Sequence, residues 1–202
     1  MKLYYSPGAC SLSPHIVARE AGLPVELKKV DLRAKLVEGS ADYLKTNGKG
    51  YVPCIELPDG SVLTEGPAIV QYMADQNPDA GLAPKAGTME RYRLQEWLNF
   101  ITSELHKAMG AFFNPGITPE WRKATEDRLA LRCEWLAKQL EGKDYLMGKQ
   151  FTVADAYLFT VLNWAGMVKF DLGRWPVLGQ YQQRVAARPQ VQEALKAEGL
   201  IK

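Results

Sequence analysis

The sequence predicts a chain of two parts, an α/β domain over residues 1–80 and an all-helical domain over residues 87–202. Three observations support this division. Strand and helix patterns alternate through the first part. Residues 76–87 are rich in Asn, Pro, Asp and Gly, as linkers between domains are. Beyond them, strand patterns almost disappear and helical patterns follow one another.

The first part opens with a strand, a helix and a second strand. The strand covers residues 2–5, and the helix covers residues 10–21 and ends at Gly22. The second strand covers residues 25–30. Because strands joined by a crossover helix run in the same direction, we expect these two strands to be parallel. Residues 35–47 are polar and irregular.

In the rest of the first part, the residue pattern predicts a helical turn at residues 42–45, then a hairpin and a helix. The hairpin strands are residues 52–57 and 61–63, joined by a Pro-Asp-Gly turn. The helix has Pro67 near its first position, where the missing N–H does no harm. This order of elements is that of a thioredoxin-like domain.

The second part is predicted to be entirely helical. One of its helices starts with Thr152 and Asp155, the spacing of a capping box, and continues as a segment that is apolar on all sides. Such a helix belongs in a core. The predicted helices cover residues 88–112, 119–141, 153–169, 177–187 and 190–197.

Composition excludes several functional classes. The 202 residues carry a net charge of +2, which gives no reason to expect nucleic acid or an anionic membrane as a partner. The three cysteines have no metal-ligand spacing, so we expect neither a metal site nor a disulfide framework. A turn at Pro7-Gly8 precedes any signal-like apolar segment, and no apolar run reaches membrane-spanning length. We therefore expect a cytoplasmic protein.

Cys10 is the first candidate for chemistry. It follows the first strand and a Pro-Gly turn, and it lies at the N-terminus of the predicted helix. Unpaired N–H groups and the positive end of the helix dipole favour thiolate over thiol at such a position. The alternative is an inert, buried cysteine. His15 falls about 140° around the helix from Cys10, so it is interpreted as structural.

Two segments suit the binding of an extended peptide. In a thioredoxin-like sheet the loop at Val52-Pro53 faces the thiol, and its backbone can pair with a peptide as an added strand does. Cys54 then points the opposite way, into the core. At Glu65-Gly66 the helix N-terminus suits a carboxylate and Glu65 suits an ammonium group, a pair that matches an amino-acid head. Ordinary helix capping is the alternative here.

The helix at residues 88–112 has a polar stripe opposite its apolar face. Asn99, Ser103 and His106 share this stripe at helical spacing. It is either solvated surface or one wall of a site. Cys133 is interpreted as a core residue.

Together these segments resemble the beta class of bacterial glutathione transferases, and the resemblance covers essentially the whole chain. Of the matching segments, the one around Cys10 and the one at 97–107 are the most specific to this class. The matching segments are SPGACSLSPH around Cys10, YVP at 51–53, LTEGPAIVQY at 63–72, WLNFITSELHK at 97–107 and FTVADAYLF at 151–159.

The resemblance implies a glutathione site, a homodimer, and glutathione as co-substrate with no other cofactor. Cys10 and His106 are the implied catalytic residues. Many relatives in other classes carry Ser where Gly66 stands, so less hydroxyl bonding is expected here. The implied glutathione-binding residues are Cys10, Lys35 (glycyl carboxylate), Val52 (cysteinyl backbone), Glu65 and Gly66 (amino-acid head), Asn99, Ser103, Glu104, Leu105 and His106, with a partner subunit expected near residues 103–105.

The implied function is conjugation of glutathione to hydrophobic electrophiles, with thiol–disulfide exchange through Cys10. Two like charges raise each other's pKa, so either Cys10 or glutathione carries the thiolate. Position 13 is Ser, so a second glutathione must resolve a mixed disulfide at Cys10. Tyr5 is a minor candidate for activating the thiol. The alternatives are a non-catalytic glutathione-binding or regulatory protein and a glutathione-dependent dehalogenase, with Phe112, Phe113 and Trp164 shaping the electrophile pocket.

Overall fold

The computed structural model describes all 202 residues and divides into two compact units. The first contains Met1–Ala83 together with Ala187–Lys202, and the second contains Pro84–Ala186. Residues 87–202 are predicted from the sequence to form the second part. The structure instead groups the last sixteen residues with the first unit, because the C-terminal helix packs on the first helix of the chain.

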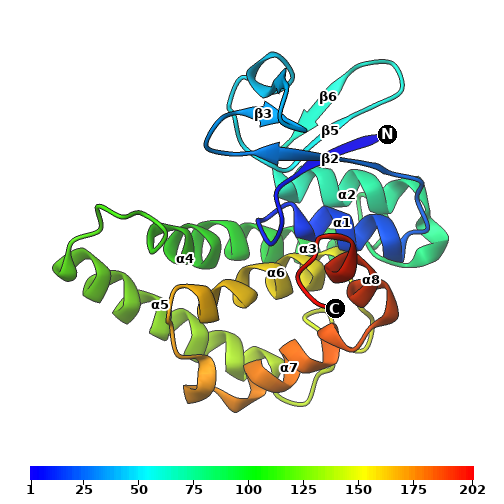
Figure 1. Ribbon diagram of the computed structural model, residues 1–202. Helices are drawn as coiled ribbons and strands as arrows, with labels where there is room; N and C mark the ends of the chain where they lie inside the picture. The colour runs from blue at the N-terminus through cyan, green and yellow to red at the C-terminus, as the bar shows by residue number, and fades with distance from the viewer. The chain divides into compact units, whose positions relative to one another are not determined.

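The first unit is a mixed six-stranded sheet in the order β4-β3-β2-β1-β5-β6. Helices α1 and α2 cover one face of it, and α8 packs against α1 (Figure 1). The elements are β1 (Lys2–Tyr5), α1 (Leu12–Glu20), β2 (Glu26–Asp31), β3 (Leu36–Val37), β4 (Ala41–Asp42), η1 (Tyr43–Lys45), β5 (Cys54–Glu56), β6 (Val62–Thr64), α2 (Gly66–Gln76), η2 (Pro78–Ala80) and α8 (Pro189–Ala197).

The strand pairing confirms the predicted thioredoxin-like order. β1 and β2 are parallel, while β5 pairs antiparallel with both β1 and β6. The turn η1 lies inside the segment where a helical turn was predicted. The strands β3 and β4 were not predicted, because strands of two residues are too short to show an alternating pattern. The predicted helix at 10–21 begins two residues later, at Leu12.

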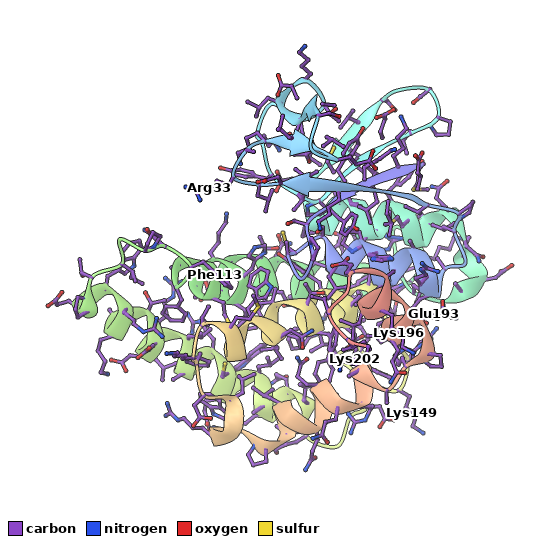
Figure 2. All side chains as sticks on the ribbon, in the orientation of Figure 1. Arg33, Phe113, Lys149, Glu193, Lys196 and Lys202 are labelled. Carbon is purple, nitrogen blue, oxygen red and sulfur yellow. The ribbon has the colours of Figure 1, made fainter.

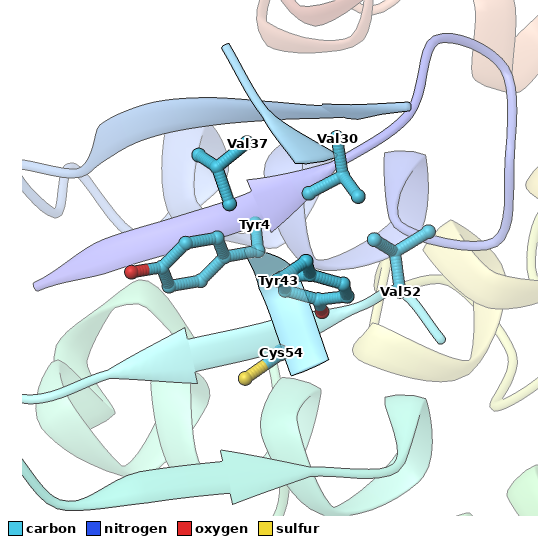
Figure 3. Close-up of a cluster of buried hydrophobic side chains, with 6 residues drawn as sticks. All are labelled: Tyr4, Val30, Val37, Tyr43, Val52 and Cys54. Carbon is cyan, nitrogen blue, oxygen red and sulfur yellow. The ribbon is translucent and has the colours of Figure 1, made fainter. Parts of the chain in front are cut away.

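A compact aromatic and aliphatic cluster fills the sheet face that carries Tyr4 and Cys54 (Figure 3). Tyr4 and Cys54 are paired across β1 and β5, and the Tyr4 and Tyr43 rings lie 5.5 Å apart. Burial raises the pKa of Cys54 to about 11, so this sulfur is an inert core group, as predicted. The cluster consists of Tyr4, Val30, Val37, Tyr43, Val52 and Cys54.

The second unit is built from helices alone. None of the chain's helices combines the length and the apolar character needed to cross a bilayer. The elements are α3 (Met89–Phe100), the π-helical segment η3 (Ile101–His106), α4 (Lys107–Ala111), α5 (Pro119–Leu140), α6 (Val153–Met167), η4 (Leu172–Arg174) and α7 (Pro176–Ala186).

The predicted continuous helix at 88–112 is interrupted by η3. Its start coincides with hydroxyl side chains that bond to carbonyls four residues earlier: Thr102 Oγ1 to Leu98 O at 2.8 Å and Ser103 Oγ to Asn99 O at 3.0 Å. Such bonds compete with the regular helical ladder and bend helices. Single π turns of this kind occur often at functional sites.

Helix α6 forms the core of the second unit, as predicted, and its capping box is present. Asp155 is buried and accepts hydrogen bonds from the N–H and the hydroxyl of Thr152, each at 2.9 Å. It also accepts from Leu146 N at 2.8 Å and from the Tyr181 hydroxyl at 3.0 Å. Burial raises the pKa of Asp155, against the lowering effect of these donors.

Candidate active site

Cys10 lies in the loop between β1 and α1, and its side chain is partly buried. Backbone hydrogen bonds tighten this loop, from Ala9 N to Ser6 O at 3.0 Å and from Leu12 N to Ala9 O at 2.9 Å. The Cys10 thiol donates to the carbonyl oxygen of Val52, with the sulfur 3.0 Å from it. The structure therefore brings together two predicted site residues that are 42 positions apart.

The segment before β5 is held rigidly. The Tyr51 carbonyl accepts from the Tyr43 hydroxyl at 2.6 Å and from Asn47 Nδ2 at 2.8 Å. The next peptide bond, Val52–Pro53, is cis. The Val52 side chain is buried, so the residue offers its backbone. A backbone segment held in this way is able to pair with an extended peptide.

Lys35 lies beside the same segment. Its ammonium group donates to the Gly50 carbonyl at 2.9 Å. Lys35 and Gly50 both have positive φ angles, of 59° and 65°, and a Cβ at Gly50 would lie only 3.3 Å from Lys35 Cε. Gly50 therefore leaves room for the lysine stem, two residues before Val52.

Glu65 and Gly66 form the corner where α2 begins. Glu65 is the N-cap residue and has a φ of 72°, a region that L residues other than Gly, Asn and Asp seldom adopt. Backbone strain of this kind accumulates at functional sites. A Cβ at Gly66 would lie 3.9 Å from Pro53 Cγ, so this corner adjoins the Val52–Pro53 segment.

The Glu65 carboxylate is largely exposed and makes no capping hydrogen bond to α2. It pairs with Lys49 at 2.5 Å, and the same ammonium group donates to Thr64 Oγ1 at 3.0 Å. The Glu65 carboxylate can therefore hold an ammonium group at this corner.

His106, in the second unit, ends η3 and contacts two aromatic residues of α6. Its Nδ1 lies 2.5 Å from the Tyr157 hydroxyl, and its ring meets the Trp164 ring edge-on at 4.8 Å. Burial, with a smaller contribution from Lys107, lowers the pKa of His106 to about 4. The imidazole is therefore neutral at pH 7 and acts through hydrogen bonds rather than through charge.

The other predicted residues of this segment differ in accessibility. Asn99 and Ser103 are exposed, as a polar stripe requires. Glu104 is paired with Arg128 at 3.1 Å and with Arg132 at 2.5 Å, which lowers the pKa of its carboxyl. Leu105 is fully buried, so its side chain is part of the helical core and only its backbone is available to a ligand.

Two of the three aromatic residues expected to shape an electrophile pocket are linked to His106 by successive ring contacts. Trp164 contacts His106 and also meets Phe113 edge-on, with ring centroids 5.9 Å apart. Phe113 is half-exposed just beyond α4 (Figure 2). Phe112 is buried and stacks on Phe170, with centroids 6.4 Å apart.

Tyr157, the partner of His106, was not predicted from the sequence. It lies in a helix interpreted as uniformly apolar core, where nothing but its hydroxyl distinguished it. That hydroxyl was the available signal, because a buried tyrosine O–H needs a hydrogen-bond partner. Tyr5, by contrast, is held as a phenol, because burial and the charge of Glu198 raise its pKa. The His, Cys, Asp and Glu side chains form no group of three or more that could hold a metal ion.

Comparison with known proteins identifies the family. Residues 8–76 match the model of the glutathione S-transferase N-terminal domain, and residues 100–189 match that of the C-terminal domain. Glutathione S-transferase GstA of Escherichia coli is 45% identical over 200 residues, which cover 99% of this chain and 100% of that protein. A glutathione S-transferase of Xanthomonas campestris is 37% identical, covering 99% of this chain and all of that one.

Solved structures of similar proteins agree. A ternary complex of BphK, a bacterial GST, superposes with a TM-score of 0.97 at 57% identity, covering 98% of this chain and 100% of that chain. A sphingomonad glutathione S-transferase complexed with glutathione gives 0.95 at 46% identity over both full chains. The beta-class enzyme of Sphingomonas chungbukensis gives 0.95 at 48%, again over both full chains. The chain therefore belongs to the glutathione S-transferase family, in its bacterial beta class.

Proposed function

We propose that this transferase conjugates the thiolate of glutathione to hydrophobic electrophiles and also catalyses thiol–disulfide exchange through Cys10. The observation that carries the proposal is the 3.0 Å contact between the Cys10 sulfur and the Val52 carbonyl. It joins a reactive side chain to a backbone segment suited to an extended peptide. Glutathione bound to the sphingomonad relative supports the choice of ligand.

Glutathione binding uses three contacts of the first unit. Glu65 takes the ammonium group of the amino-acid head in place of Lys49, and the first N–H groups of α2, at Gly66, face the head's carboxylate. The backbone of Val52 pairs with the cysteinyl residue. Lys35, which donates to Gly50 in the free protein, turns to the glycyl carboxylate.

Exchange proceeds in two balanced steps. The Cys10 thiolate attacks the glutathione sulfur of a disulfide that contains glutathione, which forms a mixed disulfide between Cys10 and glutathione and releases the other half as a thiolate. A second glutathione thiolate then attacks the mixed disulfide, so that oxidised glutathione leaves and the Cys10 thiolate is restored. The hydrogen bond to Val52 holds Cys10 as a thiol in the free protein, so Cys10 must lose its proton before the first step.

Conjugation uses the other sulfur. Cys10 keeps its proton and donates to the glutathione thiolate, which attacks the electrophile, forms a carbon–sulfur bond and expels the leaving group as an anion. His106 is neutral, so it is available as a hydrogen-bond donor rather than as a charge. If Tyr157 donates to Nδ1, the ring proton lies on Nε2 and that nitrogen becomes the donor.

A Glu65→Gln variant tests the site. Retention on immobilised glutathione and turnover of a chlorinated dinitrobenzene are measured together. We expect the Michaelis constant for glutathione to rise about tenfold, because a charge-assisted hydrogen bond is lost. Glu26→Gln is the matched control, since Glu26 is an exposed glutamate paired with Lys28.

Retention by the unaltered chain without any turnover, either of the electrophile or of a disulfide, would favour a non-catalytic binding protein. Turnover of chlorinated substrates of a single pathway would favour a dehalogenase.

The second unit carries an apolar face suited to a second copy of the chain, which supports the homodimer. Tyr92, Leu131 and Trp135 are exposed on α3 and α5. The Trp135 ring lies 5.5 Å from that of Trp97 and 4.8 Å from that of Phe100. Exposed apolar clusters of this kind mark association sites. Three free cysteines fit a reducing compartment, so we place the dimer in the cytoplasm.

A Leu131→Glu variant tests the dimer. We expect the unaltered chain to have about twice the monomer mass of 22.6 kDa by light scattering, and the variant to dissociate because a charge is buried in the interface. Met167→Glu is the control, since Met167 is about equally exposed, at 66% against 68%, and lies at the end of α6. A variant that kept the dimer mass would show that this face is not the interface.

A further inference from the structure

The C-terminal helix is fastened to the helix that follows Cys10 at both of its ends. At its start, Arg188 forms a two-pronged ion pair with Glu20, at 2.6 and 2.7 Å. At its end, one carboxylate oxygen of Glu198 lies 2.9 Å from His15 Nδ1. The Glu198 and His15 side chains are 0% and 2% exposed. Burying a carboxylate costs folding free energy unless the carboxylate is paired, so a buried pair of this kind points to a role beyond stability.

The second oxygen of Glu198 reaches the loop that carries Cys10. It accepts a hydrogen bond from Gly8 N at 2.9 Å. Gly8 lies two residues before Cys10 and has a φ of 70°, a conformation that only a few other residue types adopt readily. The buried Glu198 carboxylate thus connects Gly8, in the loop that carries Cys10, with His15 in α1, the helix that follows this loop.

The end of α8 is shaped to cover the same loop. Gly199 has a φ of 72°, and the N–H of Leu200 returns to Leu195 O at 2.9 Å, which is the closing bond of a Schellman motif. The chain therefore turns back, and Leu200 Cδ2 lies 3.4 Å from the position that a Cβ on Gly8 would occupy. Leu200 packs over Gly8, and Glu198 holds it from within.

We infer that Glu198 is a positioning residue for Cys10, acting through Gly8 and His15, and that residues 198–200 form a strap over the reactive loop. The inference rests on the proposed role of Cys10. The carboxylate fixes the backbone before Cys10 against α1, so the sulfur is held where it can meet a disulfide in line. His15, interpreted from the sequence as structural, thereby belongs to the same hydrogen-bonded arrangement.

The test compares two reactions of Cys10 in the full-length protein. The first is formation of the mixed disulfide with oxidised glutathione in a single turnover, which requires an oriented sulfur. The second is alkylation by iodoacetamide, which places a weaker demand on orientation. Peptide mass spectrometry assigns both to Cys10, and the other two cysteines are buried. Neither reading depends on steady-state turnover.

In Glu198→Ala we expect mixed-disulfide formation to slow about tenfold, because two hydrogen bonds to a buried charge are lost, while alkylation changes less than about threefold. Glu198→Gln keeps one acceptor oxygen, so it should recover part of the rate. Glu193→Gln is the matched control. Glu193 lies on α8 and pairs with α1 through Arg19 at 3.5 Å, but at the surface (Figure 2). It should react at the unaltered rate.

Hydrogen exchange gives a second reading if Glu198→Ala does not fold. In Leu200→Ala the strap is loosened without removing the carboxylate, and we expect faster amide exchange across residues 6–10 together with slower mixed-disulfide formation. Mixed-disulfide formation at the unaltered rate in Glu198→Gln and Leu200→Ala would overturn the inference. If Cys10 formed no mixed disulfide even in the unaltered protein, the proposed exchange function would fail instead.

Discussion

Replacing Cys10 with alanine is expected to reduce thiol–disulfide exchange by at least about a hundredfold, the scale of loss seen when a nucleophile is removed. The reason is that Cys10 forms the bond in the first step, and no other sulfur in the chain can replace it. Conjugation to a chlorinated dinitrobenzene should fall by less than about tenfold, because there Cys10 supplies one hydrogen bond to the glutathione thiolate. Steady-state rates for both reactions, measured on one preparation, check this.

The matched control is Cys133→Ala. Burial raises the pKa of Cys133 to about 12, so its thiol is unreactive near neutral pH, and its removal should leave both activities in place. The opposite pattern in Cys10→Ala, with conjugation lost and exchange intact, would show that the two sulfurs have been assigned the wrong roles.

The hydrogen bond from Cys10 to Val52 explains why this prediction separates the two reactions. A carbonyl oxygen accepts a hydrogen bond from a thiol and repels a thiolate, so the free protein holds Cys10 in the form that conjugation uses. Exchange needs the other form. The same residue therefore serves two reactions in two protonation states, and the variant affects them unequally.

The local elements of the fold were predictable, because each is specified by nearby residues. Tyr4 and Tyr5 belong to a short run of strand-favouring aromatic residues, and the Pro-Asp-Gly turn fixes the hairpin of β5 and β6. The capping-box spacing of Thr152 and Asp155 predicts the start of α6. The strands β3 and β4 were missed because two residues carry no period, and η3 was missed because six residues in a π turn are too few to show a period of their own.

The candidate site residues could be predicted from their residue types and positions, whereas the residues that hold them in place could not. Nothing in the sequence near Cys10 points to Glu198, which lies 188 positions later and looks like the end of a polar helix. Its role depends on α8 packing against α1, a tertiary contact between distant segments. The neutral state of His106 was hidden for the same reason, since burial against Tyr157 and Trp164 causes it.

Replacing Asp155 with alanine is expected to lower the free energy of unfolding by about 4 kcal/mol, since buried donors that lose their acceptor cost about 1–3 kcal/mol each. Those donors are Leu146 N, Thr152 N, the Thr152 hydroxyl and the Tyr181 hydroxyl. Asp155→Asn keeps one acceptor oxygen, and we expect about half the loss. Urea unfolding followed by tryptophan fluorescence measures both.

Asp171→Ala is the control for this measurement. Asp171 also accepts a backbone N–H, from Gly173 at 2.8 Å, but it is exposed, so water can replace it and the loss should stay below about 1 kcal/mol. Equal effects of Asp155→Ala and Asp171→Ala would show that burial does not set the cost.

The consequences of losing Asp155 should extend to activity, because its carboxylate holds the start of the helix that carries Tyr157 and Trp164. Both residues contact His106, and burial keeps the pKa of that histidine low. If α6 frays from its start, His106 becomes hydrated and its pKa returns toward the ordinary value near 6.5. At pH 6 a loosened variant would therefore carry a charged His106 where the intact protein carries a neutral one, and conjugation in Asp155→Asn should depend on pH between about 5 and 7, where the unaltered enzyme does not titrate this group.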